Sequence, residues 1–259
     1  QSRNPDYREG DVVRALVGWE EYSRVPADTL GLAHVDTAPG LPLSYFMGSL
    51  GPSGLTAYVG LHRIGTVAAG ETVVVSAASG AVGNVVGQIA KIRGCRAIGI
   101  VGNDDKARLC RQLGYDATVN YRATPDLAKA LADALGDGAD IYFDNVGGAT
   151  LDAMLPLMKT YGRIVVCGMI ANYNDADNPY PIRNLWQILV KRTTMRGFLT
   201  YDHTDLIEQA QRDLNAWALS GQLQPLENVT HGIENTPAAF IRLMSGQTSG
   251  KTVVRLHDT

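Results

Sequence analysis

Short apolar segments alternate with amphipathic segments along most of the chain. The apolar segments contain consecutive β-branched residues, such as residues 73–75 and 164–166, where a half-exposed strand would alternate apolar and polar positions. Such runs are typical of strands buried on both faces of a parallel sheet. The pattern predicts six strands, over residues 72–78, 96–101, 117–120, 141–145, 163–167 and 194–199, and five intervening helices, over residues 82–93, 105–113, 126–135, 150–158 and 182–191. This alternation predicts a doubly wound α/β sheet.

The segments on either side of this unit have different patterns. They predict, in order, a strand over residues 11–25, a glycine- and proline-rich linker over residues 31–42, a helix over residues 44–63, a long amphipathic helix after residue 204, a strand over residues 227–233, a short helix capped by Thr236 and Pro237, and a last strand over residues 251–256. A chain of 259 residues is long enough for one large domain or two modest ones.

Composition excludes several classes of partner. The 23 basic residues nearly balance the 26 acidic ones, and no basic block could follow a phosphate backbone, so we expect no nucleic-acid partner. No apolar window approaches the roughly 20 residues of a membrane span, and the first ten residues do not resemble a secretory leader. The cysteines Cys95, Cys110 and Cys167 are far apart and odd in number, which argues against a disulfide framework or a metal clip. A cytoplasmic location fits these features best.

The strand predicted over residues 72–78 runs directly into a glycine turn and a helix. The spacing is AxGxxG, with Ala78, Gly80 and Gly83, and Ala78 stands where the usual fingerprint has its first glycine. Such a turn lets main-chain N–H groups and a helix N-terminus approach a pyrophosphate. The pattern indicates a Rossmann-type dinucleotide site, and the alternative is a tight turn that only lets the helix pack closely on the strand.

Charge near the second strand distinguishes the two nicotinamide dinucleotides. About 20 residues after the turn, an NAD site places an acid on the ribose, whereas an NADP site offers a cation. This chain has Gly102 there, followed by Asp104, Asp105 and Lys106. We interpret the two aspartates as the helix N-cap and first turn, and Lys106 as a ligand of the 2′-phosphate. This favours NADP(H) over NAD(H), although Lys106 could also be a solvated helix lysine.

Several blocks together carry a family resemblance that covers nearly the whole chain. They are GLTAYVGL (residues 54–61), SAASGAVGNVVGQIAK (76–91), NDDKARLCRQLGYDATVNYR (103–122), YFDNVGG (142–148), GRIVVCGMIANYN (162–174), RGFLTYDH (196–203) and SGKTVV (249–254). The chain resembles the zinc-independent medium-chain dehydrogenase/reductase superfamily, and within it the NADP-dependent alkenal/one oxidoreductases, which include prostaglandin, leukotriene B4 and curcumin reductases.

The resemblance implies a role for particular residues of this chain. They are Ser79, Gly80, Ala81 and Val82 on the pyrophosphate, Lys106 and Tyr121 at the 2′-phosphate, Asn145 at the nicotinamide half, Cys167, Gly168, Met169, Ile170 and Tyr173 in a loop along the cofactor, and Phe198, Leu199 and Thr200 at the carboxamide. Thr248 stands where the family commonly has an asparagine. Phe198 and Cys167 could instead be core residues, and Asn145 could cap the following turn.

The resemblance also implies an architecture. Family members begin with a longer N-terminal part that builds most of a GroES-like β-barrel. We therefore expect residues 1–43 to be a remnant of that domain, residues 44–222 to form the NADP-binding Rossmann domain, and residues 223–259 to return to an incomplete barrel. A homodimer is expected, because the strand near residues 194–199 would leave an unpaired sheet edge.

The implied reaction is hydride transfer to the β-carbon of an α,β-unsaturated ketone or aldehyde. Tyr173 is then the catalytic candidate, because its hydroxyl could donate a hydrogen bond to the enolate oxygen. A zinc alcohol dehydrogenase is disfavoured, since residues 49–56 contain no cysteine, histidine or carboxylate, and we expect no metal. A quinone reductase of the same fold, or a module that binds NADPH without turnover, are the alternatives.

Overall fold

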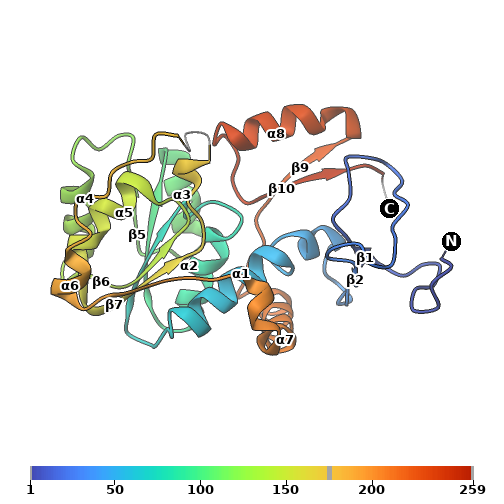
Figure 1. Ribbon diagram of the computed structural model, residues 1–259, viewed down its shortest axis with the longest axis horizontal. Helices are drawn as coiled ribbons and strands as arrows, with labels where there is room; N and C mark the ends of the chain where they lie inside the picture. The colour runs from blue at the N-terminus through green and yellow to red at the C-terminus, as the bar shows by residue number, and fades with distance from the viewer. Residues whose placement is uncertain (1, 174–176, 258–259) are drawn as a thin grey trace.

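A parallel six-stranded sheet is the centre of the structure. The computed structural model describes residues 2–173 and 177–257, so Gln1 and Asn174, the last residue of the GRIVVCGMIANYN block, lie outside the described residues. The strands lie in the order β5-β4-β3-β6-β7-β8, and every neighbouring pair is parallel. Figure 1 shows helices on both sides of this sheet. Their bounds are β3 Thr72–Ser76, β4 Arg96–Val101, β5 Ala117–Asn120, β6 Ala139–Asp144, β7 Met158–Val166 and β8 Thr194–Gly197. The prediction of six parallel strands is confirmed.

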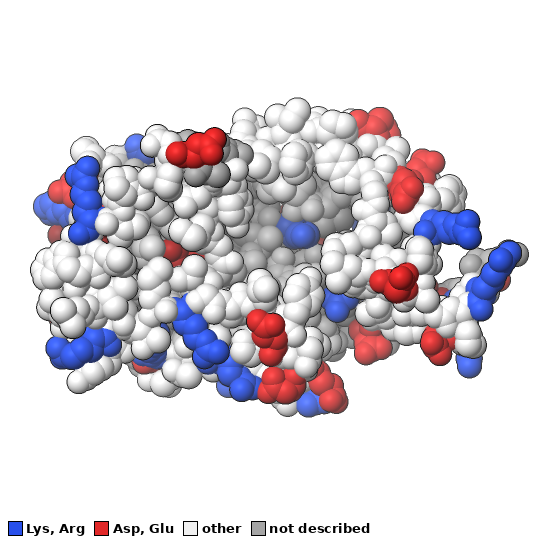
Figure 2. Space-filling model, in the orientation of Figure 1, with Lys and Arg blue, Asp and Glu red and all other residues white. Residues whose placement is uncertain are grey.

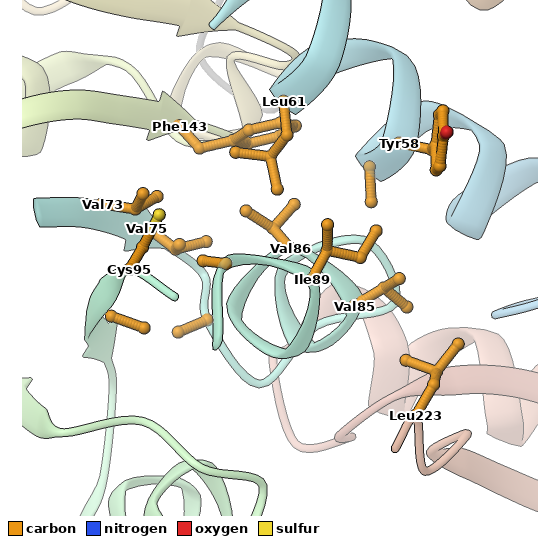
Figure 3. Packing of buried hydrophobic residues seen from close by; sticks show 14 of the residues in the cluster. Tyr58, Leu61, Val73, Val75, Val85, Val86, Ile89, Cys95, Phe143 and Leu223 are labelled. Atoms are coloured by element: carbon orange, nitrogen blue, oxygen red, sulfur yellow. The ribbon is translucent and has the colours of Figure 1, made fainter. Parts of the chain in front are cut away.

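Helices cover both faces of this sheet. One core lies between the sheet and α1 (Pro52–Val59), α2 (Gly83–Ile92), α3 (Asp104–Gln112) and α7 (Ile207–Leu219), and the other contains α4 (Leu127–Leu135), α5 (Gly148–Met154) and α6 (Gln187–Lys191). Val73 and Val75 of β3 point into the first core and Val74 into the second, which explains the continuous β-branched run. Figure 3 shows Val86 of α2 near Val75 and Leu61, and Val85 on the side of the helix nearest Leu223.

The predicted element boundaries differ from the observed ones at several places. β7 begins at Met158, five residues before the predicted strand, because residues 159–162 contain no apolar run and give no strand signal. The register irregularity between Ala139 and Ile141 and the positive φ at Tyr161 lie in this same part of the strand pair. The helix predicted over residues 44–63 is divided into a 3-10 segment, Leu43–Met47, then α1, then a π-helical turn, Gly60–Ile64.

The N-terminal segment forms much less strand than predicted. Only β1, Val13–Arg14, pairs, and it does so antiparallel with β2, Ala33–His34, inside the predicted linker. Leu16, Val17 and Trp19, the next apolar residues, are exposed. Among the described residues β1 pairs only with β2. Backbone without a partner strand forms no hydrogen-bond ladder. The predicted strand over residues 11–25 is therefore wrong in extent.

The C-terminal segment, residues 223–257, contains a second parallel strand pair. β9 (Glu227–His231) pairs with β10 (Lys251–Arg255), and α8 (Thr236–Met244) connects them. The predicted cap of α8 is wrong: Asn235 occupies the N-cap position without a capping side-chain bond, and its amide donates to His231 O at 2.8 Å. The proposed domain boundaries after residues 43 and 222 stay a prediction.

In the part of the chain that the structure describes, each helix is too short or too polar to pass through a lipid bilayer. Cys95, Cys110 and Cys167 are all free thiols.

Candidate functional site

The strand order creates a crevice at one edge of the sheet. The chain continues from β3 toward β4 and β5 on one side, whereas β6, on the other side of β3, leads to β7 and β8. The loops after β3 and β6 therefore diverge, and ligands of doubly wound sheets bind at such a switch point. All the predicted site residues that follow strands lie at this same edge, since the strands are parallel. Figure 2 shows a hollow near the middle of the molecule with a basic side chain inside it.

Several N–H groups of the glycine turn, residues 77–83, are open. Gly80 N–H is not one of them, because it donates to Ala77 O at 2.8 Å. The N–H groups of Ala81 and Val82 have no acceptor among the described residues, and Val82, the N-cap of α2, has no capping side-chain bond. The start of α2 is therefore open to an anion.

Gly83 brings α2 close to the strand. A Cβ at this position would lie 2.3 Å from Ala77 O, so only glycine fits, and Ala77 itself has a φ of +48°. Gly87, one helical turn later, packs on Tyr115, whose hydroxyl donates to Gly83 O at 2.7 Å. The tight packing and the open N–H groups are thus two properties of one turn, and the two interpretations of the AxGxxG spacing are not exclusive.

The C-terminal segment borders this turn. Gly250 N–H donates to Ser79 O at 2.7 Å, and Gly80 and Gly250 pair as a parallel bridge. Thr248, two residues earlier, is buried. Ser79 and Thr248 therefore lie close to the predicted pyrophosphate position.

Two cations and a phenol gather after β4 and β5. The N-cap of α3 is Asn103, whose side chain accepts from Lys106 N–H at 2.8 Å, so the N-cap prediction for Asp104 is wrong and both aspartates lie in the first turn. Lys106 Nζ donates to Gly246 O at 2.6 Å, and burial, followed by the charge of Arg122, lowers the pKa of Lys106.

Tyr121 and Arg122 complete this group. The guanidinium of Arg122 lies 5.7 Å from the centroid of the Tyr121 ring, and the ring lies against Gly102, where a side chain would be crowded. Sequence reasoning missed Arg122, although it directly follows Tyr121 in the NDDKARLCRQLGYDATVNYR block.

Asn145 connects the ends of β6 and β3. Its Nδ2 donates to Ser76 O at 2.8 Å, and its own N–H donates to Ser76 Oγ, also at 2.8 Å. The preceding Asp144 is fully buried and was not predicted as a site residue. The sequence signal for it was an acid directly after the buried residues Ile141, Tyr142 and Phe143.

The loop after β7 folds back over the end of β6. The N–H groups of Cys167 and Gly168 both donate to Asp144 O, and burial, with the charge of Asp144, raises the pKa of Cys167 to about 12. The thiol is therefore neutral at physiological pH and behaves as a partly buried apolar group. Met169 packs beside Gly147, and Ile170 is exposed.

Tyr173 is 64 % exposed. A Cβ on Gly168 would lie 3.3 Å from Tyr173 Oη, so the hydroxyl is held near the start of this loop. This places the phenol at the carboxyl edge of the sheet.

The residues after β8 have mixed environments. Phe198 packs on the first core, where a Cβ on Gly60 would lie 3.0 Å from its ring, which favours the interpretation of this residue as core. Leu199 is exposed, and Thr200 Oγ1 lies 3.0 Å from Thr56 Oγ1 on α1.

Comparison with known proteins gives consistent matches. Residues 81–215 match the family described as "Zinc-binding dehydrogenase". The chain is 44% identical over 256 residues to an NADP(+)-dependent 2-alkenal reductase of Nicotiana tabacum, covering 98% of this chain and 74% of that protein. It is 42% identical over 257 residues to prostaglandin reductase 1 of Mus musculus, covering 98% and 78%. The crystal structure of CurA in complex with NADPH from Vibrio vulnificus aligns with a TM-score of 0.89 at 38% identity, over 98% of this chain and 76% of that one.

The chain belongs to the medium-chain dehydrogenase/reductase superfamily. Within it, the chain groups with the NADP-dependent alkenal/one oxidoreductases, as the resemblance implied. The matched family's description includes zinc, but the residues for a zinc site do not fit: residues 2–173 and 177–257 contain no group of three or more histidine, cysteine, aspartate or glutamate side chains that could hold a metal ion.

Proposed function

We propose that this protein is an NADPH-dependent oxidoreductase that reduces the C=C bond of α,β-unsaturated ketones and aldehydes. The observation that carries the proposal is the pair of open N–H groups of Ala81 and Val82 at the switch point, in a chain 44% identical to a 2-alkenal reductase. The residues present fit the cofactor, because the turn offers N–H donors at a helix N-terminus and Lys106 and Arg122 supply positive charge one strand away.

Each group of site residues has a role in this proposal. The turn at Ser79, Gly80, Ala81 and Val82 binds the pyrophosphate, Lys106, Tyr121 and Arg122 bind the 2′-phosphate, Thr248 closes the turn, and Asn145, Cys167, Gly168, Met169, Ile170, Phe198, Leu199 and Thr200 border the nicotinamide end. When bound, NADPH supplies a hydride for the β-carbon of the substrate. Tyr173 donates a hydrogen bond to the substrate oxygen, where negative charge develops, and solvent supplies the proton.

The direct test is oxidation of NADPH, followed by its absorbance, with a panel of enones, alkenals and quinones. We expect turnover with enones and alkenals and little with quinones. Binding of NADPH without oxidation would support the binding-module alternative, and faster oxidation by quinones would support a quinone reductase.

We expect Tyr173→Phe to lower kcat about tenfold, since one hydrogen bond to a developing charge is worth roughly 1.5 kcal/mol. Tyr180→Phe is the control, because Tyr180 is another partly exposed tyrosine, which bonds Asp152 instead. Steady-state kinetics of both variants provide the measurement, and an unchanged kcat for Tyr173→Phe would remove it from the catalytic residues.

We expect Lys106→Ala to raise the KM for NADPH about tenfold and to leave the KM for NADH nearly unchanged, because only NADPH carries the 2′-phosphate. Lys129→Ala is a control at an exposed lysine that bonds Asp133 on α4. Equal losses with both cofactors would show that Lys106 supports the fold instead of reading the phosphate.

Assembly and location are part of the proposal. All four residues of β8 are exposed at the sheet edge, and Leu189, Met195 and Leu199 expose apolar surface near it. We therefore propose a homodimer that pairs β8 with its copy. Sedimentation of the wild type should give a dimer, and Met195→Lys should shift it toward monomer; a monomeric wild type would contradict this.

A cytoplasmic location is proposed from the three free thiols.

A further inference from the structure

Two buried amide side chains lie on α2, directly behind the glycine turn. Asn84 is fully buried and Gln88 is 4% exposed, although both occupy a helix whose other inward positions are apolar. A buried amide is costly unless its donors and acceptors are paired. The partners of these two side chains therefore indicate what the amides are for.

Asn84 holds two of the carbonyl groups of the turn. Its Nδ2 donates to Gly80 O at 2.7 Å and to Ala81 O at 3.0 Å. In a trans peptide the C=O and the following N–H point in opposite directions. Fixing the carbonyls of Gly80 and Ala81 toward Asn84 therefore directs the N–H groups of Ala81 and Val82 away from it, and both are open donors of the turn.

Gln88 continues this chain of bonds into the C-terminal segment. Its Nε2 contacts Asn84 through both the main-chain oxygen, at 3.2 Å, and Oδ1, at 3.4 Å, and donates to Gln224 O at 3.1 Å. Its Oε1 accepts from Gln224 N–H at 2.7 Å. Both main-chain groups of Gln224 are thus held by one side chain. Leu223, the neighbour of Gln224, is buried in the same core as Val85 of α2 (Figure 3).

The C-terminal segment then returns to the turn by a second route. Leu226 O accepts from Lys251 N–H at 2.9 Å, and Gly250 N–H donates to Ser79 O at 2.7 Å. The bonds form a closed circuit from the turn through Asn84, Gln88 and Gln224 to Gly250 and back to Ser79. Displacement of the segment at Gln224 is therefore transmitted to the turn from both sides.

We propose that Asn84 and Gln88 are positioning residues for the cofactor: they form an amide relay that aims the N–H groups of Ala81 and Val82 and couples their orientation to the docking of the C-terminal segment. This inference depends on the proposed function in one respect only, which is that the ligand of the turn is NADPH. Both side chains are buried, so both act through the main chain of the turn.

The test compares Gln88→Met with Gln211→Met. Methionine keeps the length of glutamine and removes its hydrogen bonds. Gln211 of α7 is a matched control, because its Nε2 also donates to a main-chain carbonyl, Leu50 O at 2.9 Å, away from the turn. Titration with NADPH should show about tenfold weaker binding for Gln88→Met, as for the loss of about 1.4 kcal/mol of hydrogen bonding, and wild-type binding for Gln211→Met.

Hydrogen exchange of the cofactor-free protein gives a second readout. We expect faster exchange in residues 79–83 and 248–251 in Gln88→Met and not in Gln211→Met. If Gln88→Met does not fold, Gln88→Glu keeps the acceptor for Gln224 N–H, loses the donors, and should weaken NADPH binding in the same direction. For saturating NADPH, the KM for the enone should not change.

Equal effects of Gln88→Met and Gln211→Met, or an NADPH Kd within twofold of wild type with unchanged exchange, would overturn the relay. The titration needs no turnover. A wild-type protein that binds NADPH but reduces no enone would therefore contradict the proposed reaction, while the Gln88 variants would still confirm or overturn this proposal.

Discussion

Replacing Gly83 by alanine should weaken NADPH binding at least about a hundredfold and lower the free energy of unfolding by roughly 2–4 kcal/mol. The added Cβ would lie 2.3 Å from Ala77 O and 2.9 Å from the Cα of Ala78. Both are main-chain atoms, so no side-chain rotation relieves the contact. The first turn of α2 must move away from β3, and the N–H groups of Ala81 and Val82 move with it.

Gly221→Ala provides the control for this prediction. Gly221 has a φ of +76°, but no atom lies within 4 Å of the position that a Cβ would take, so alanine there adds backbone strain of about 1 kcal/mol and no collision. Thermal unfolding and NADPH titration of both variants separate the two effects. A Gly83→Ala protein with wild-type affinity would show that the turn tolerates movement and would remove the central support of the proposed site.

Much of the fold could be predicted because its signals are local. The apolar residues of the buried strands recur with a different period from those of the helices. Consecutive apolar residues such as 73–75 require a strand that is covered on both faces of the sheet. Once the strands are parallel, their carboxyl ends share an edge, so the positions of Ser79, Asn145 and Cys167 relative to one another follow from topology. Residues 11–25 were different: their apolar alternation indicated a strand, but a strand also requires a partner, which the pattern does not report.

The details that sequence reasoning missed depend on contacts between distant parts of the chain. Gln88 and Gln224 are separated by 136 positions, and nothing in either local pattern links them. Lys106 was predicted from its position after the second strand, but its bond to Gly246 O arises only because the loop before β10 passes over α3. Asn103 differs from the predicted cap by one residue, since asparagine and aspartate cap helices equally well.

Asp144 is the other residue whose loss should have a large effect. Its Oδ1 accepts four hydrogen bonds, from Tyr142 Oη at 2.8 Å, Ser76 Oγ at 3.0 Å, and the N–H groups of Val146 and Gly147 at 2.9 Å. Its Oδ2 is buried and has no partner among the described residues. These hydrogen bonds lie where β6 ends, beside the proposed nicotinamide position.

We expect Asp144→Ala to lower the free energy of unfolding by about 3–5 kcal/mol, because it strands the fully buried Tyr142 hydroxyl and two main-chain N–H groups without an acceptor. For a chain of this size that is a fall of roughly 10 °C in Tm. Asp144→Asn should recover part of the loss, since an amide oxygen can accept the same four bonds, whereas the amide nitrogen would be buried without an acceptor.

The comparison of the two Asp144 variants separates geometry from charge. If hydrogen-bond acceptance holds the turn at residues 145–148, the asparagine variant is more stable and binds NADPH more tightly than the alanine variant. If the negative charge itself were required, the two variants would be equally unstable. Calorimetric unfolding together with NADPH titration distinguishes these results, and an alanine variant as stable as the wild type would contradict the assigned role of this buried carboxylate.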